Sequence, residues 1–240
     1  MGPAPEGVEV WRPWHNTVAL TGGTAMISEP VNKPDVQTVW RNYEIMRPAS
    51  RENSRLLTLG KSNKNSIFGF SADRTWGDFA VYNLYNSDKN KSVDLTLDFA
   101  DAGLPAGIRC AVYNFWENKV VGYATDSFTG KNIPQNGSLL LRFTPLTGGS
   151  PKLIGSNLHL SIGATEIEEV YTTSTSIKIM LSSAGAQTGD LIFYSTKPLE
   201  AGVSENCSIS SVQGLGDNLW KVSVNGRTWN TKQSIVLNSK

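Results

Sequence analysis

From about Ser54 onward, apolar and polar residues alternate with a period of two. Between Val93 and Phe99 the apolar residues are separated by Asp94, Thr96 and Asp98, which places one side of a strand in a core and the other in water. The alternation returns in three later runs: Leu139, Leu141 and Phe143; Ile177, Ile179 and Leu181; and Trp220, Val222 and Val224. Turn residues separate these runs. The pattern predicts an antiparallel β-sandwich of about ten to thirteen short strands.

The stretch from Pro34 to Pro48 follows a different pattern and predicts an amphipathic helix. Its apolar residues recur at i, i+3, i+4 and i+7, the spacing that places them on one helical face. They are Val36, Val39, Trp40 and Tyr43. Pro34-Asp35 marks the expected start of this helix, and Pro48 marks its end. A weaker helical pattern covers about residues 13–20.

Residues 24–28, which lie between the two expected helices, predict a strand buried on both faces. The run is uncharged, follows Gly22-Gly23 and stops at Glu29-Pro30. When helices cover both faces of a sheet, both sides of a strand are buried, so its residues form a continuous apolar run without alternating polar positions. A single helix–strand–helix unit cannot bury its own faces. We therefore expect neighbouring elements that this chain does not encode, and a chain that is a fragment of a larger protein.

These patterns suggest three regions and a mainly β fold. Residues 1–50 form a short α/β unit, and residues 51–164 form an antiparallel β-sandwich. Residues 165–240 either complete that sandwich or form a second, small β-domain, because Gly163-Ala164 gives only a weak boundary.

Charge and hydropathy narrow the range of partners. The chain has 22 Lys and Arg against 21 Asp and Glu, so no long-range field attracts it to nucleic acid or to an anionic membrane. No apolar run approaches the roughly 18–20 residues that span a bilayer. A neutral partner such as a sugar fits this balance. Residues 1–7 lack the pattern of a signal peptide, and the compartment stays open.

The sequence contains no motif for a cofactor or a metal. We find no Gly-rich phosphate loop and no cluster of His and Cys at metal-binding spacing. His15 and His159 are the two histidines, and they lie in unlike segments. Cys110 and Cys207 lie in separate predicted strands. A disulfide between them is possible, but two buried free thiols are the simpler interpretation.

The segment from Trp11 to His15 holds the strongest candidates for sugar binding. Indole rings offer flat faces to the C–H surface of a pyranose, and His can hydrogen-bond its hydroxyl groups. Trp11, Trp14 and His15 are therefore predicted substrate-binding residues, although the tryptophans can equally serve as packing residues. We add Glu29, because strand ends face the active site in α/β barrels. A helix-capping or loop role for Glu29 is equally open.

No catalytic residue is assigned. A glycosidase needs two carboxyl groups across the scissile bond, one of them with a raised pKa. Before Pro34 the acidic residues are Glu6, Glu9 and Glu29, and no spacing pairs two of them on neighbouring strand ends. Later acidic residues are expected to form a solvated sheet face. These are Asp73, Asp78, Asp94 and Asp98.

Several segments resemble the melibiase clan of glycoside hydrolases, which holds the α-galactosidases and the raffinose-synthase-like enzymes. The segments His15 to Gly23 and Ala25 to Pro30 resemble the last barrel strand of that clan and the helix before it. The clan's usual pattern is His-x-x-x-x-x-x-Ser-Gly-Gly-x-x-x-x-Ser-Asp, in which Thr21 here replaces Ser and Glu29 replaces Asp. Three further segments look like later parts of the family: Arg47-Pro48, Phe79 to Asn86, and Gly189 to Pro198.

The resemblance implies that residues 1–50 are the end of a catalytic (β/α)8 barrel, followed by the C-terminal β-domain of a retaining enzyme. The parent reaction would be cleavage or transfer of an α-linked sugar without a cofactor, and the catalytic aspartates would lie on barrel strands that this chain lacks. Its partners would be an α-galactoside-like carbohydrate and that missing N-terminal barrel.

The alternative is a free-standing carbohydrate-binding β-sandwich that performs no chemistry. Its sugar platform would be formed by Trp76, Trp116, Trp220 and Trp229.

Overall fold

The computed structural model describes residues 8–23, 32–34, 40–60, 65–148, 151–228 and 230–239. The helices are α1 (Val8–Leu20) and α3 (Trp40–Glu44), and neither is long and apolar enough to cross a membrane. The first strands are β1 (Arg55–Leu56), β2 (Ser66–Ala72), β3 (Phe79–Tyr85), β4 (Val93–Asp98), β5 (Cys110–Asn114), β6 (Lys119–Ala124), β7 (Ser127–Ile133) and β8 (Ser138–Pro145). They are followed by β9 (Lys152–Ser156), β10 (Ile167–Thr172), β11 (Ser176–Leu181), β12 (Gly189–Tyr194), β13 (Leu199–Glu205), β14 (Ser208–Gly216), β15 (Leu219–Asn225) and β16 (Gln233–Ser239).

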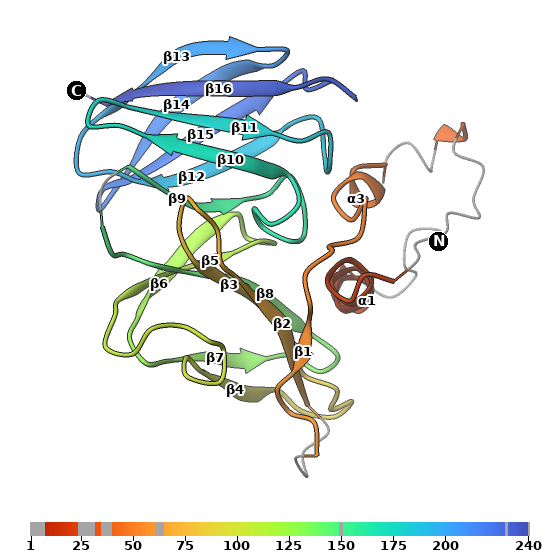
Figure 1. The fold of residues 1–240 in the computed structure, drawn as a ribbon. Helices are drawn as coiled ribbons and strands as arrows, with labels where there is room; N and C mark the ends of the chain where they lie inside the picture. Colours follow the sequence, from red (N-terminus) through yellow and green to blue (C-terminus); the bar gives the residue numbers. More distant parts are fainter. Residues whose placement is uncertain are drawn as a thin grey trace.

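The strands form antiparallel sheets, as the alternating pattern predicted (Figure 1). One sheet has six strands in the order β1-β2-β3-β8-β5-β6. A separate two-stranded antiparallel sheet, β4-β7, lies below it in the figure. Two four-stranded sheets follow, β14-β15-β12-β9 and β10-β11-β16-β13. The chain is therefore mainly β. Because β9 pairs with β12, residues 152–156 join a C-terminal sheet, while the domain bounds at 50 and 164 stay a prediction.

Strand β3 shows how the six-stranded sheet is covered on both faces. All its residues except Tyr85 are buried, and they read as a nearly continuous apolar run. Ala80, Tyr82 and Leu84 point to one side, where they pack with Leu95 and Leu97 of β4. On the opposite side lie Phe79 and Val81. A strand covered on both faces loses the polar alternation that β4 keeps.

The two four-stranded sheets enclose a second apolar region, which we call the C-terminal core. It lies between β14-β15-β12-β9 and β10-β11-β16-β13. Leu191 and Phe193 of β12 meet Ile177 and Ile179 of β11, and all four are fully buried. The period of two in β11 buries every second residue of that strand, as the sequence predicted.

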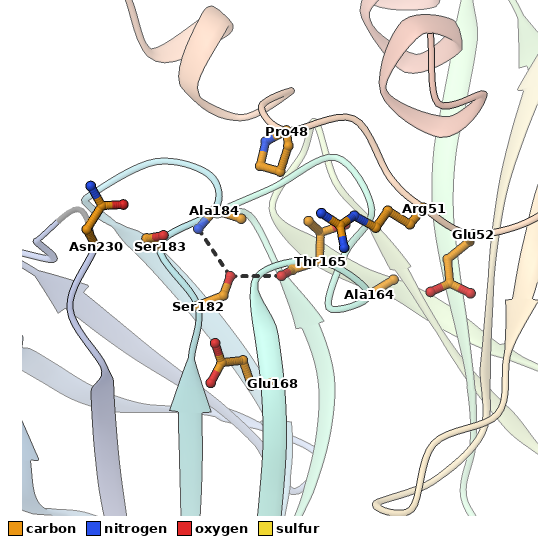
Figure 2. A pocket seen from close by; sticks show the side chains of 10 residues that line it. All are labelled: Pro48, Arg51, Glu52, Ala164, Thr165, Glu168, Ser182, Ser183, Ala184 and Asn230. Carbon is orange, nitrogen blue, oxygen red and sulfur yellow. Dashed lines mark hydrogen bonds between the residues drawn. The ribbon is translucent and has the colours of Figure 1, made fainter. Parts of the chain in front are cut away.

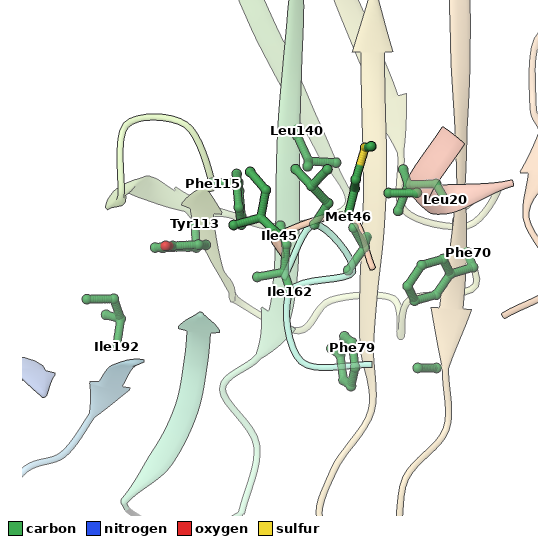
Figure 3. Close-up of a cluster of buried hydrophobic side chains, with 14 of the residues drawn as sticks. Leu20, Ile45, Met46, Phe70, Phe79, Tyr113, Phe115, Leu140, Ile162 and Ile192 are labelled. Carbon is green, nitrogen blue, oxygen red and sulfur yellow. The ribbon is translucent and has the colours of Figure 1, made fainter. Parts of the chain in front are cut away.

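The remaining face of the six-stranded sheet contributes to a third region, the middle layer. Its buried apolar side chains come from the end of α1, from the segment that includes Ile45 and Met46, and from strands β2, β3, β5 and β8. Five residues from the later part of the chain complete it: Ile154, Leu160, Ile162, Ala186 and Ile192. Figure 3 shows Leu20, Ile45 and Met46 close to Leu140 in this layer. The middle layer therefore joins the N-terminal segment, the six-stranded sheet and the C-terminal sheets.

The described helices differ in their limits from those that the sequence predicted. Helix α1 begins at Val8, so Pro13 lies inside it instead of at its start. Helix α3 ends at Glu44, before Pro48, and Ile45 and Met46, which follow it, are buried in the middle layer. A proline disfavours helix at the residue before it, so the helix stops short of Arg47. The predicted strand at 24–28 and helical residues 35–39 lie outside the described residues.

Candidate functional site

Helix α1 brings three of the four predicted sugar-binding residues together. Trp11 and His15 are one turn apart, and their ring centroids lie 4.6 Å apart at a steep angle. Trp14 also contacts His15, with ring centroids 5.1 Å apart. Trp14 is 38% exposed, while His15 is 4% exposed. The fourth residue, Glu29, lies outside the described residues, and the binding role of all four stays a prediction.

His15 offers a buried hydrogen-bond acceptor at the centre of this cluster. Its Nδ1 lies 2.9 Å from the carbonyl oxygen of Trp11, so Nδ1 carries the proton and Nε2 has a free lone pair. No described residue is a hydrogen-bond partner of this Nε2. Burial lowers the pKa of His15, and the hydrogen bond to Trp11 offsets only part of that effect. The neutral ring can accept a hydrogen bond from a hydroxyl group or a water molecule.

A third tryptophan, Trp116, completes the aromatic group. Its ring lies edge-on to Trp11 with centroids 5.2 Å apart, and the guanidinium of Arg12 lies 5.2 Å from its ring centroid. Cations over an indole face are attracted by the ring quadrupole. Trp116 follows β5, about a hundred positions from α1, so no local spacing could have linked the two. The cluster is built by the packing of α1 on the sheet.

Buried Asn16 fixes α1 to the six-stranded sheet. Its Nδ2 donates to Asn83 Oδ1 at 2.7 Å and to Ser138 Oγ at 3.1 Å. Its Oδ1 accepts a hydrogen bond from Trp116 Nε1 at 3.1 Å. Sequence reasoning missed this network. The available signal was Asn83 itself, a polar residue in the middle of the apolar run of β3.

One pair of carboxyl groups meets part of the chemical requirement for acid catalysis. Partial desolvation and the neighbouring Asp73 carboxyl raise the pKa of Asp78, while Lys152 opposes the rise. Both aspartates lie in the short connection from β2 to β3. The cavity beside them, lined by Asp78, Trp76 and Lys152, has a volume of about 10 Å³. A cavity of this size has room for about one water molecule at most and is too small for a sugar.

The tryptophans of the alternative sugar platform are not displayed as a flat surface. Trp76 and Trp220 are half-buried, and so is Trp116. Trp76 stacks on Phe79 with centroids 5.3 Å apart, and Trp220 packs against the C-terminal core. Trp229 lies outside the described residues.

Cysteine and metal chemistry do not add to this site. Cys110 is buried in β5 and Cys207 is half-buried before β14, and both are free thiols. Burial raises the pKa of Cys110 to about 11, which keeps that thiol protonated. Within the described ranges, no three His, Cys, Asp or Glu side chains gather in a way that could hold a metal ion.

No protein-family model and no curated protein matches the chain. Among solved structures it is similar to a GH27 β-L-arabinopyranosidase from Geobacillus stearothermophilus in complex with arabinose, at 13% identity over 58% of this chain and 31% of that chain, with a TM-score of 0.47. It is also similar to α-galactosidase I from Mortierella vinacea, at 14% identity over 61% of this chain and 38% of that chain, with a TM-score of 0.47.

A third similar structure is the isomalto-dextranase of Arthrobacter globiformis T6 complexed with panose. The identity is 12% over 97% of this chain and 45% of that chain, with a TM-score of 0.44. The chain thus spans less than half the length of each of these three solved structures.

Proposed function

We propose that this chain is the C-terminal portion of a glycoside hydrolase that acts on α-linked sugars, an α-galactosidase or a raffinose-synthase-like enzyme. Its β-domain acts mainly as a support for a catalytic (β/α)8 barrel, of which residues 1–50 form the end. The barrel and an α-galactoside-like carbohydrate are its partners.

The observation that carries the proposal is the attachment of α1 to the β-sheet through Asn16. This helix spans the segment whose sequence resembles the helix before the last barrel strand. Its buried side, with Asn16, Ala19 and Leu20, packs against the strands of the β-domain. A helix that is shared in this way ties the two parts together, since three buried hydrogen bonds set its position.

The remaining side of α1 supports a role next to another layer. Trp14 and Thr17 are exposed, and Trp11 is half-buried. In Figure 1, α1 lies at the side of the six-stranded sheet, away from the C-terminal sheets. The exposed ring of Trp14 is suited to contact with a barrel strand or a bound sugar, whereas His15 Nε2 beside it is buried.

A structural role for the β-domain agrees with the chemistry of its carboxyl groups. The Asp73 and Asp78 pair has one raised pKa but adjoins a cavity of about 10 Å³, too small for a pyranose. A retaining glycosidase places its two carboxyl groups about 5–5.5 Å apart on either side of a sugar. The catalytic pair is therefore assigned to the barrel.

Hydrolysis of a chromogenic α-galactoside tests the proposal. The complete gene product, with any region encoded upstream of Met1, should hydrolyse the substrate. The purified chain of 240 residues should give no turnover above a boiled control.

Two results would contradict the proposal. One is clear turnover by the purified 240-residue chain, which would locate the catalytic pair within it. The other is a gene product that has no barrel upstream and no hydrolase activity.

A further inference from the structure

A cleft lined by polar side chains and by apolar surface lies between the segment after α3 and the hairpin β10-β11 (Figure 2). Its volume is about 640 Å³, within the range of small-molecule sites. Pro48 and Arg51 approach from one side, and Ser183 and Asn230 lie on the other. Thr165 and Glu168 belong to the hairpin side, just before and within β10. None of these residues belongs to the aromatic cluster on α1.

Buried Arg227 holds the loop that forms one wall. Its guanidinium donates to the carbonyl oxygen of Ala186 at 2.8 Å and of Ala184 at 3.0 Å, and also to that of Ser182. Its Nε donates to Gln233 Oε1 at 3.2 Å. Charge-assisted bonds of this kind are stronger than neutral ones. The loop at 182–186 therefore has a fixed shape.

A second buried network holds the opposite wall. His159 accepts from the backbone N–H of Ser161 at its Nδ1 (3.0 Å), so its Nε2 carries the proton and donates to Pro48 O at 2.8 Å. Glu166 accepts from the N–H of Gly163 at 2.7 Å. Ser182 Oγ donates to Thr165 O at 2.8 Å, one of the dashed lines in Figure 2, and so joins the two ends of the β10-β11 hairpin within the hairpin side of the cleft.

Some of the polar side chains that line the cleft are bonded within the protein: Glu52 pairs with Arg74, and the hydroxyls of Ser182 and Thr165 are hydrogen-bonded. The others are available to a ligand. Arg51, Glu168, Ser183 and Asn230 make no hydrogen bond or ion pair with any residue that the structure describes. They supply both donors and acceptors. The charges balance, because Arg51 faces Glu168 in the lining and the third charged residue there, Glu52, is neutralised by its ion pair with Arg74. Pro48 adds an apolar surface. The hydrogen-bonded frame is rigid, and the exposed polar groups on it can pair with a ligand.

We propose that this cleft binds a neutral, polyhydroxylated ligand, a short oligosaccharide. A hydroxyl group both donates and accepts, and so it can pair with a guanidinium, a carboxylate, a hydroxyl and an amide within one site. The balanced charge gives no preference for an anion or a cation. This inference goes beyond the proposed function, because it requires no catalytic centre.

Calorimetric titration of the purified chain with two neutral tetrasaccharides, stachyose and maltotetraose, tests the inference. At least one should bind saturably, with little change in affinity when NaCl rises, because the ligand carries no charge. Ser183→Trp fills the cleft and should weaken binding at least about tenfold, a loss of about 1.4 kcal/mol. The matched control is Ser174→Trp, in the exposed turn at the other end of the β10-β11 hairpin.

Three results would overturn the inference: no saturable binding of either tetrasaccharide, equal binding by Ser183→Trp and wild type, or equal losses in Ser183→Trp and Ser174→Trp. If Ser183→Trp does not fold, Glu168→Gln together with Asn230→Ala replaces it, and unchanged binding by that variant counts against the cleft. The hydrolysis assay is independent of these titrations, so failure of one proposal is distinguishable from failure of the other.

Discussion

The C-terminal core and the middle layer are both buried, but they are held together differently. The C-terminal core is filled by apolar side chains from strands that follow one another between residues 153 and 237. The middle layer draws on segments from Ala19 to Ile192 and adjoins buried polar side chains such as Asn16 and His159. Apolar contacts are non-directional, so the free energy lost when one side chain is removed scales with the apolar area that is lost. Hydrogen-bonded groups depend on each named partner.

The largest effect should follow from opening the C-terminal core. Phe193 of β12 is fully buried between the two four-stranded sheets. Phe193→Ala should lower the free energy of unfolding by about 3–5 kcal/mol, because it removes a large apolar group and leaves a cavity. Urea denaturation followed by circular dichroism measures the change.

An exposed aromatic residue in the same part of the chain provides the control. Tyr171 of β10 is 57% exposed, so Tyr171→Ala should change the free energy of unfolding far less than Phe193→Ala. Similar losses in the two variants would show that the C-terminal core is not the source of this stability.

The sequence predicted the C-terminal core better than the middle layer, for a physical reason. Ile177, Ile179 and Leu181 alternate with polar residues because β11 has one buried face, so the period reports the strand. Asn16 contacts Asn83 and Ser138, which lie 67 and 122 positions away, and no local period reports such a pair. The sequence did single out the contiguous run from Trp11 to His15, but the predicted helix began at about residue 13, so the contact of Trp11 with His15 one turn apart was not predicted. That run could not include Trp116, which joins them only through tertiary packing.

The predicted helix limits were also inexact. Pro48 was the local stop signal after α3, but the helix ends at Glu44, and the N–H of Ile45 makes a last helical bond to Arg41 O at 3.0 Å. A proline also disfavours helix at the residue before it, so its effect reaches back along the chain from Pro48.

An intermediate effect should follow from removing the polar anchor of α1. Asn16→Ala leaves Asn83 Oδ1, Ser138 Oγ and Trp116 Nε1 without their partner. An orphaned buried group costs about 1–3 kcal/mol. The space left by the Asn16 side chain admits water, which can bond to more than one of the three groups, so the total loss should be about 1–3 kcal/mol and below that of Phe193→Ala. The variant should unfold at lower urea concentration, and its tryptophan fluorescence should change because Trp116 is involved.

Thr17 is the matched control on the same helix. Its side chain is exposed and bonds only to the carbonyl of Pro13 within α1, so Thr17→Ala should shift the free energy of unfolding by no more than about 0.5 kcal/mol. If Asn16→Ala were as stable as Thr17→Ala, the attachment of α1 to the sheet would not depend on the Asn16 network.

The smallest effect is a pH dependence that separates the polar regions from the apolar core. Burial lowers the pKa of His15, and burial likewise lowers the pKa of His159, with Glu166 opposing and Arg227 reinforcing the latter shift. An unfolded chain binds protons at both histidines as the pH falls through 6.5, whereas the folded chain does not. Stability is therefore complete above that pH and declines below it, until the folded-state pKa values are reached. The decline is at most about 1.4 kcal/mol per pH unit for each histidine.

Non-titrating variants assign this slope to individual residues. His159→Gln and His15→Gln should each remove part of the loss of stability below pH 6.5, and the double variant should remove both parts, measured as the free energy of unfolding at a series of pH values. The pKa values of Glu44 and Asp78 are raised, so these groups change the free energy of unfolding with pH in the opposite direction. Both groups are present in the wild type and in the variants, so their contribution cancels when the two are subtracted. Phe193→Ala lowers stability equally at every pH, because it removes no proton-binding group. A wild-type slope that persists in the His15→Gln, His159→Gln double variant would show that neither ring is held neutral by burial. The hydrogen bonds from His15 to Trp11 O and from His159 to Pro48 O would then not be made by rings that burial keeps neutral.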